Sequence, residues 1–242
     1  VFLLALPFVV KLLGGSEKDV GLCVGVFTFG YIISCLTVSR RLDRYCPKRT
    51  LQLSSAVITV AVLASFILSE ISRHVDLPAD PVLIFILLNA VIGPTLAFFW
   101  PPIMGWLSTG HEGHVLSKRL GLFNFSWSFA IVISPLIAGI IIQADPLLAL
   151  LLAAGCLFLA FVSVSAAIRP CRKIPDSKSE HHIQKEAIHP LNSIFRAMSR
   201  FSLVTSCLTL MVFRTQFALL FTEEFGFSES QFGIATTLYC LA

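Results

Sequence analysis

Long apolar runs alternate with short polar segments along the whole chain. Six of these runs have about the roughly 20 residues that a helix needs to cross a hydrocarbon core of ~30 Å. They are Val20–Val38, Leu51–Leu68, Pro81–Leu107, Leu120–Gln143, Pro146–Ile168 and Phe201–Phe221. Apolar residues also fill both ends, at Val1–Val10 and Phe232–Ala242. The pattern predicts the last part of helix 1, complete helices 2–7 and the start of helix 8, with both ends cut from a longer protein.

The basic residues predict how these helices cross the membrane. Of the eighteen Lys and Arg residues, fourteen fall in the connectors that follow helices 2, 4 and 6. They are Arg40, Arg41, Arg44, Lys48, Arg49, Lys118, Arg119, Arg169, Arg172, Lys173, Lys178, Lys185, Arg196 and Arg200. Short connectors rich in Lys and Arg stay in the cytoplasm, so these three are expected to face inward. The other connectors hold only Lys11, Lys18 and Arg73, and Arg214 lies inside an apolar run.

The composition excludes a water-soluble globule. Hydrophobic residues make up 56% of the chain and charged residues 13%, and so few polar side chains cannot cover that much apolar surface. The mean hydropathy is +0.84. The net charge of +4 is explained by the inward connectors, whose cations lie near anionic headgroups, so no nucleic-acid partner is expected. The seven cysteines show no CxxC pair, and most lie in apolar runs, which favours a small apolar role over a disulfide or a metal site.

The longest polar stretch divides the chain. Residues 169–200 contain three prolines and many charges, which makes them too polar to enter a bilayer. They are expected to form a cytoplasmic linker. The predicted organisation is therefore an N-terminal six-helix bundle at 1–168 with helix 1 truncated, this linker, and the start of a C-terminal bundle at 201–242, made of helix 7 and a truncated helix 8.

A short internal repeat opens the two units. Gly14–Gly21 matches Gly226–Gly233 without a gap, with four of eight residues identical. Six crossings separate the copies and return the chain to the same side, and parallel six-helix repeats are one design of secondary transporters. Two similar helix hairpins would also account for the residues. In each copy the first glycine is expected to end one helix, and Ser16 or Ser228 to cap the next.

The loop between helices 2 and 3 carries the most specific motif. It reads Ser39-Arg40-Arg41-Leu42-Asp43-Arg44-Tyr45-Cys46-Pro47-Lys48-Arg49. Together with six helices, a basic linker and a repeated opening, it resembles the major facilitator superfamily, although the two glycines usual in that loop are replaced. The resemblance implies an all-α integral membrane protein with an MFS-type helical bundle. It also implies a secondary transporter that moves a small solute by alternating access, with Asp43, Arg44, Lys48 and Arg49 forming a conformational-switch loop.

Two helices depart from the motifs of that family. Proton-coupled members often carry an arginine in helix 4 and a glycine four residues later, whereas here the register reads Asn89-Ala90-Val91-Ile92-Gly93. Helix 5 reads Ser134-Pro135-Leu136-Ile137-Ala138-Gly139, which resembles the glycine-proline motif of exporters without its leading glycine, so import and export both stay open. No Asp or Glu lies in the six complete runs, so a uniporter or exchanger stays open beside a proton-coupled transporter.

Arg214 is the strongest candidate for a substrate residue. It lies 13 residues after Phe201, roughly 20 Å along a helix at ~1.5 Å per residue. Ionisable residues at membrane depth usually face a cavity or a partner, and the resemblance places helix 7 beside the central path. We expect Arg214 to bind an anionic group of the substrate or to pair with a carboxylate of the second half. The alternative is that it extends to the outer interface, toward Glu223 or Glu224.

Four uncharged residues complete the predicted pathway: Asn89, Trp100, Asn124 and Ser128. Asn89 lies at a depth similar to that of Arg214, and a buried amide is costly without a partner, so we expect it either to bond a neighbouring helix or to face a wet cavity. Trp100 either stacks on substrate or packs, and the two prolines after it are expected to bend helix 4. Asn124 and Ser128 share a helix 5 face with small residues, which favours close packing over a pathway role.

No cofactor, metal ion or nucleotide-binding loop is expected. The histidines of His111-Glu112-Gly113-His114 lack the zinc-protease spacing, which favours a solvated turn. The expected partners are a small-molecule solute, the lipid bilayer and, for coupled transport, protons, and the protein is expected to act as a monomer in the plasma or inner cell membrane. A membrane sensor or scaffold is an alternative. An integral-membrane lipid-modifying enzyme is disfavoured because the dense polar loops are basic and poor in acids.

Overall fold

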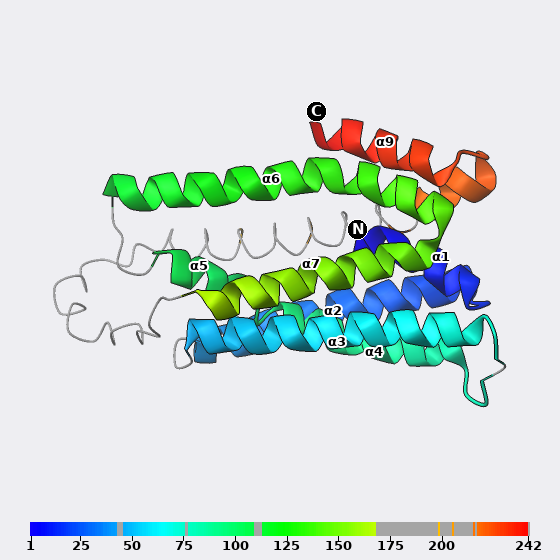
Figure 1. Ribbon diagram of the computed structural model, residues 1–242, viewed down its shortest axis with the longest axis horizontal. Coiled ribbons are helices and arrows are strands. Elements are labelled where there is room, and N and C mark those ends of the chain that lie inside the picture. Colours follow the sequence, from blue (N-terminus) through cyan, green and yellow to red (C-terminus); the bar gives the residue numbers. More distant parts are fainter. Residues whose placement is uncertain are drawn as a thin grey trace.

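The computed structural model describes residues 1–42, 46–75, 77–108, 113–167, 198, 205, 215 and 217–241, and every regular element in these ranges is helical. The elements are α1 (Phe2–Leu12), α2 (Glu17–Leu42), α3 (Pro47–Ser72), α4 (Pro81–Leu96), α5 (Trp100–Ser108), α6 (Gly113–Ala144), α7 (Pro146–Ala166), η2 (Leu220–Glu224) and α9 (Glu229–Leu241). The long helices run side by side along the longest axis of the molecule (Figure 1).

Five segments of the described chain are long and apolar enough to cross a membrane, namely α2, α3, the α4–α5 segment, α6 and α7. They coincide with five of the six predicted runs, so the predicted all-α membrane bundle is confirmed. The sixth run and the linker at 169–200 lie almost entirely outside the described residues.

The two ends of the bundle differ in charge. One, which we call the basic end, carries Lys48, Arg49, Lys118 and Arg119 at the starts of α3 and α6. The other, which we call the acidic end, carries the turns between α1 and α2, α3 and α4, α6 and α7, and η2 and α9 (Figure 1). Its acids are Glu17, Asp19, Glu70, Asp80, Asp145, Glu223, Glu224 and Glu229.

The repeated turns have the same local structure. Gly14 and Gly226 both adopt positive φ, +84° and +67°, a region that glycine enters without steric cost. The backbone N–H of Ser16 donates to Asp19 Oδ2 at 2.7 Å, and the backbone N–H of Ser228 donates to Gln231 Oε1 at 2.9 Å. In both pairs a side chain three residues into the helix satisfies the N-cap N–H. Ser228 completes a capping box, since the Gln231 N–H donates to its Oγ at 3.3 Å, whereas the Ser16 hydroxyl donates to Asp19 Oδ2 at 2.7 Å. The predicted glycine ends are confirmed, and the predicted serine cap is confirmed at Ser228.

Prolines set where several helices begin and break. The Asp80 and Asp145 carboxylates cap α4 and α7, each followed by a proline in the first turn, where the missing N–H costs nothing. The predicted bend in helix 4 is a break: α4 ends at Leu96 and α5 begins at Trp100. Pro101 and Pro102 cannot donate to the preceding turn, which interrupts the helix at this point.

Small residues allow the helices to pack closely. On α4, a Cβ added at Gly93 would overlap the carbonyl oxygen of Phe27 on α2. On α3, the hydroxyls of buried serines and a threonine are satisfied within the helix, since Ser55, Thr59, Ser65 and Ser69 each donate to the carbonyl four residues earlier. Short side chains with internal partners let helices approach in an apolar medium without leaving unpaired polar groups.

One cysteine departs from its predicted role. Cys46, the residue before α3, is disulfide-bonded, whereas the other described cysteines, Cys23, Cys35, Cys156 and Cys240, form no disulfide. The small apolar role predicted for the cysteines is therefore wrong for Cys46, which lies in a connector rather than inside an apolar run.

An ion pair closes the first bundle at the acidic end. The Arg73 guanidinium, just after α3, donates from both terminal nitrogens to the two carboxylate oxygens of Asp145, at 2.8 and 2.7 Å. Each side chain is 29% exposed. The hydrogen bond from Arg73 is the largest cause of an Asp145 pKa below its ordinary value. The bidentate geometry holds the end of α3 against the start of α7.

Replacing Asp145 with Asn should lower stability by about 1–2 kcal/mol, since a charge-assisted pair is lost while Asn still caps the helix. Because the pKa of Asp145 is lowered in the folded state, this stabilisation is fully present above the ordinary aspartate pKa of about 3.9 and is lost as the pH falls through the folded value. Thermal unfolding of the detergent-solubilised protein at several pH values measures both effects. Asp80→Asn is the matched control, because that cap has no arginine partner in the described part of the chain. Equal losses in the two variants would contradict the role of the pair.

Candidate functional site

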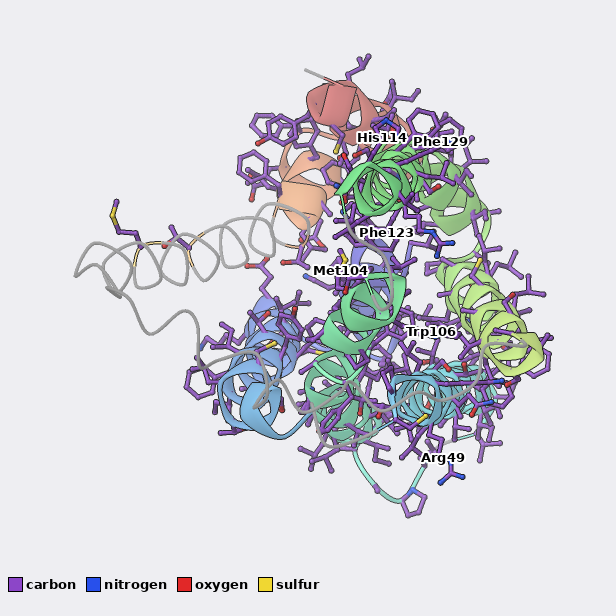
Figure 2. The ribbon with its side chains drawn as sticks, turned by 90° about the vertical axis from the view of Figure 1, so that its left-hand side faces the viewer. Arg49, Met104, Trp106, His114, Phe123 and Phe129 are labelled. Atoms are coloured by element: carbon purple, nitrogen blue, oxygen red, sulfur yellow. The ribbon has the colours of Figure 1, made fainter. Side chains whose placement is uncertain are left out.

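Three of the predicted site residues, Asp43, Arg44 and Arg214, lie outside the described residues. The other two residues of the predicted switch loop belong to the first turn of α3. Lys48 Nζ donates at 2.6 Å to the carbonyl oxygen of Ala167, just after α7, where a cation is favoured by the helix dipole. Arg49 is exposed and points away from the helices (Figure 2). This part of the loop therefore joins α3 to α7.

Asn89, predicted either to bond a neighbouring helix or to face a wet cavity, is a buried side chain of α4. Its side chain is fully buried, and Nδ2 donates at 2.9 Å to the Phe85 carbonyl of its own helix rather than to a neighbour. Its Oδ1 is buried and has no hydrogen-bond partner among the described residues. The face of α4 that carries Asn89 also carries Gly93, which packs on the α2 backbone.

Trp100 packs against a second tryptophan that the sequence analysis did not select. Its ring meets Trp127 of α6 edge to face, with centroids 4.4 Å apart, and also meets Phe99 at 5.4 Å. Trp127 stays 43% exposed. Met104 of α5 and Phe123 of α6 lie between the same two helices at the basic end (Figure 2). The available signal for Trp127 was its position beside Ser128.

Asn124 and Ser128 lie exposed on α6, on either side of Trp127 in the sequence. The structure therefore gathers Trp100, Asn124, Trp127 and Ser128 along one stretch of α5 and α6. From Pro81 to Ser108 and from Leu120 to Ala144 these helices carry no ionisable Asp, Glu, Lys or Arg. An uncharged aromatic wall with an amide and a hydroxyl suits contact with an organic solute by stacking and hydrogen bonding.

The acidic end of α6 makes a much closer contact. A Cβ added at Gly139 would lie 2.6 Å from the Glu229 carbonyl oxygen on α9, and one added at Gly233 would lie 2.6 Å from the Pro135 carbonyl oxygen on α6. The two helices lie side by side in both views (Figures 1 and 2). The packing predicted for the small residues of helix 5 is confirmed at Pro135 and Gly139, and the partner is the eighth helix.

An ion pair lies over this contact. Lys11 Nζ, in the last turn of α1, is 3.1 Å from Glu223 Oε1 in η2 and 3.9 Å from Glu17 Oε1 at the start of α2. Below it, Leu4, Phe8, Ile142, Phe232, Gly139 and Gly233 contribute to the lining of an enclosed apolar gap with no room for a water molecule. Segments separated by the predicted linker therefore close over one another at the acidic end.

No group of three or more potential metal-ligating side chains occurs in the part of the chain that the structure describes. What this arrangement offers is a contact between two helical units and an uncharged aromatic surface.

Comparison with known proteins identifies one family. A model described as Major Facilitator Superfamily matches residues 1–242, the whole chain. No curated protein and no solved structure matches the chain significantly.

Replacing Asn89 with Leu tests whether its amide is a structural liability or a functional group. Because Oδ1 is buried without a partner, an apolar side chain of similar size should leave the melting temperature unchanged or raise it. Asn124→Leu, at an exposed position, is the control and should leave it unchanged. A drop of several degrees for Asn89→Leu alone, measured by thermal unfolding in detergent, would mean that Oδ1 binds something essential, such as a buried water.

Proposed function

The chain belongs to the major facilitator superfamily, a family of secondary transporters, and we propose that it moves a small solute by alternating access between two helical units. The first unit is residues 1–168. The second begins at 201, and residues 169–200 connect them. The chain is a multi-pass membrane protein, with five segments in its described part able to span a bilayer.

The observation that carries this proposal is the contact between α6 of the first unit and α9 of the second. In the described part of the chain the two glycine backbones meet at the acidic end, and the Lys11–Glu223 pair joins α1 to η2 at the same end. Solute at the acidic end can enter only when this contact separates. A contact made by two bare glycines and one partly exposed ion pair can separate as a rigid unit without exposing buried charge.

We propose that the basic end faces the cytoplasm, following the bias of Lys and Arg toward that side. The acidic end then faces the exterior of the plasma or inner cell membrane. In this orientation the described contacts close the exterior side of the pathway. The switch loop, with Asp43, Arg44, Lys48 and Arg49, belongs to the cytoplasmic side, where Lys48 holds α3 to α7.

The proposed solute path passes the aromatic wall of Trp100 and Trp127, with Asn124 and Ser128 as hydrogen-bonding groups. Arg214 is proposed to bind an anionic group of the solute, which favours an anion or a zwitterion. The apolar runs contain no Asp or Glu, which favours uniport or exchange over proton coupling among the residues of this chain.

Replacing Gly233 with Ala tests the contact between the two units. The added Cβ would lie 2.6 Å from the Pro135 carbonyl oxygen, and overpacking of this kind costs about 1–3 kcal/mol. Solute counterflow into proteoliposomes containing the full-length protein, measured with a panel of labelled anions, zwitterions and neutral solutes, should fall by roughly tenfold. Gly155→Ala on α7 is the matched control, since nothing lies within 4 Å of its added Cβ. Equal counterflow in both variants would reject the contact as part of the cycle.

The same counterflow assay tests Arg214. Arg214→Ala should abolish transport of an anionic or zwitterionic solute, because its charged group loses its partner in the membrane. Arg214→Lys keeps the charge without the planar fork and should retain a fraction of the rate. Full transport by Arg214→Ala would exclude substrate binding by this residue.

A further inference from the structure

The Lys11–Glu223 ion pair joins two equivalent positions of the internal repeat. The two residues are 212 positions apart, the same interval that separates Gly14 from Gly226 and Ser16 from Ser228. On a twofold axis a residue meets its own symmetry mate. A direct contact between equivalent positions therefore places Lys11 and Glu223 at the local twofold axis that relates the repeated segment of the first unit to that of the second.

The charges at these equivalent positions are opposite. Two lysines or two carboxylates at one axial position would repel each other, whereas Lys11 and Glu223 attract at 3.1 Å. Glu17, the next carboxylate, lies 3.9 Å from the same ammonium group. The duplicated positions have thus become complementary.

The two copies also differ by one residue in hydrogen-bond register. In the first copy, Leu13 N–H donates to Val9 and Gly15 N–H donates to Val10. At the equivalent positions, Phe225 N–H donates to Leu220 and Phe227 N–H donates to Phe221. Each bond in the second copy spans one more residue, because the last turn of helix 7, Leu220–Glu224, is π-helical. Such turns are rare and are frequently found at functional sites.

Two side chains stabilise the widened turn. Thr222 Oγ1 donates to the carbonyl oxygens of Ala218 at 3.0 Å and Leu219 at 3.2 Å, at the junction between the α-helical and π-helical turns. The Phe221 ring lies 5.6 Å from that of Phe232, which is buried in the first turn of α9. The π turn is therefore stabilised both by hydrogen bonds within its own helix and by packing against α9 at the contact between the units.

We propose that Lys11 and Glu223 form a gate on the local twofold axis at the acidic end, and that the π turn sets the register that brings Glu223 to Lys11. This inference rests on the proposed transport function and adds the residues that control its exterior closure. Breaking the pair, or returning the turn to α-helical register, favours the state that is open at the acidic end.

The gate can be tested without a substrate by measuring how fast a residue in the closed contact reacts with a reagent added from outside. Ile142 of α6 is only 4% exposed and lines the enclosed gap beneath the pair, so Ile142→Cys serves as a reporter for a membrane-impermeant maleimide in intact cells. Lys11→Glu and Glu223→Lys each place like charges together and should increase the labelling rate by up to about fivefold, the upper limit for one exposed ion pair. The double swap restores an opposite pair at the equivalent positions but leaves Glu17 beside a carboxylate at position 11, so it should label more slowly than either single reversal.

The threonine provides the second arm. Thr222→Val removes the hydroxyl that bonds both carbonyls and should accelerate labelling as the charge reversals do, whereas Thr222→Ser keeps the hydroxyl and should not. Labelling by the double swap as fast as by the single reversals, or equal labelling by Thr222→Val and Thr222→Ser, would overturn the gate or the π turn respectively. Since a misfolded single variant would not be rescued by a second reversal, rescue also demonstrates folding.

Counterflow in the same variants separates this inference from the proposed function. If the protein shows counterflow of a panel solute but no substitution changes the labelling rate of Ile142→Cys, the gate is rejected and the proposed transport function stands. Labelling that follows the charges, without counterflow of any panel solute by the parent, supports the gate and counts against transport of those solutes.

Discussion

Close approach of helix backbones is the constraint on which this structure depends. In lipid there is little hydrophobic drive between helices, so association requires tight packing and few unpaired polar groups. Gly93 against the Phe27 carbonyl fixes α4 on α2, and Gly139 against Gly233 fixes α6 on α9. Of these two contacts, the second joins segments on either side of the predicted linker, and it requires that neither position carries a side chain.

The internal repeat explains why the closure has its particular form. Both copies start an even-numbered helix with a positive-φ glycine and a serine whose backbone N–H is bonded by the side chain three residues later, which directs the odd-numbered helices before them to the same end of the bundle. Equivalent residues then meet near the axis, as Lys11 and Glu223 do at 3.1 Å. Exact symmetry would place identical charges there. Divergence of the charge, and of the register in Leu220–Glu224, converts a repulsive arrangement into an attractive one.

Local features were predictable from the sequence because they are encoded within a few residues. The apolar runs, the glycine ends at Gly14 and Gly226 and the interruption of helix 4 at Pro101 and Pro102 all follow from neighbouring residues. The contacts were not predictable in the same way. Burial of Asn89 without a partner for Oδ1, the meeting of Trp100 with Trp127 and the Lys11–Glu223 pair depend on the rotation and depth of helices far apart in the chain. A single sequence does not specify how helices far apart in the chain are rotated and shifted relative to one another.

The strength of the closure is matched to alternation. A transporter must populate both end states, so neither can be favoured by more than a few kcal/mol. An ion pair whose side chains are 33% and 45% exposed contributes at most about 1 kcal/mol, because water competes for both charges. The π turn carries a cost of its own that the Thr222 hydroxyl offsets in part. A weak pair in a costly turn, placed over a dry glycine contact, biases the equilibrium toward closure without locking it. A buried salt bridge at the same place would have to expose two desolvated charges in each cycle, and a purely apolar seal would have no charge through which a passing ionic solute could act on it.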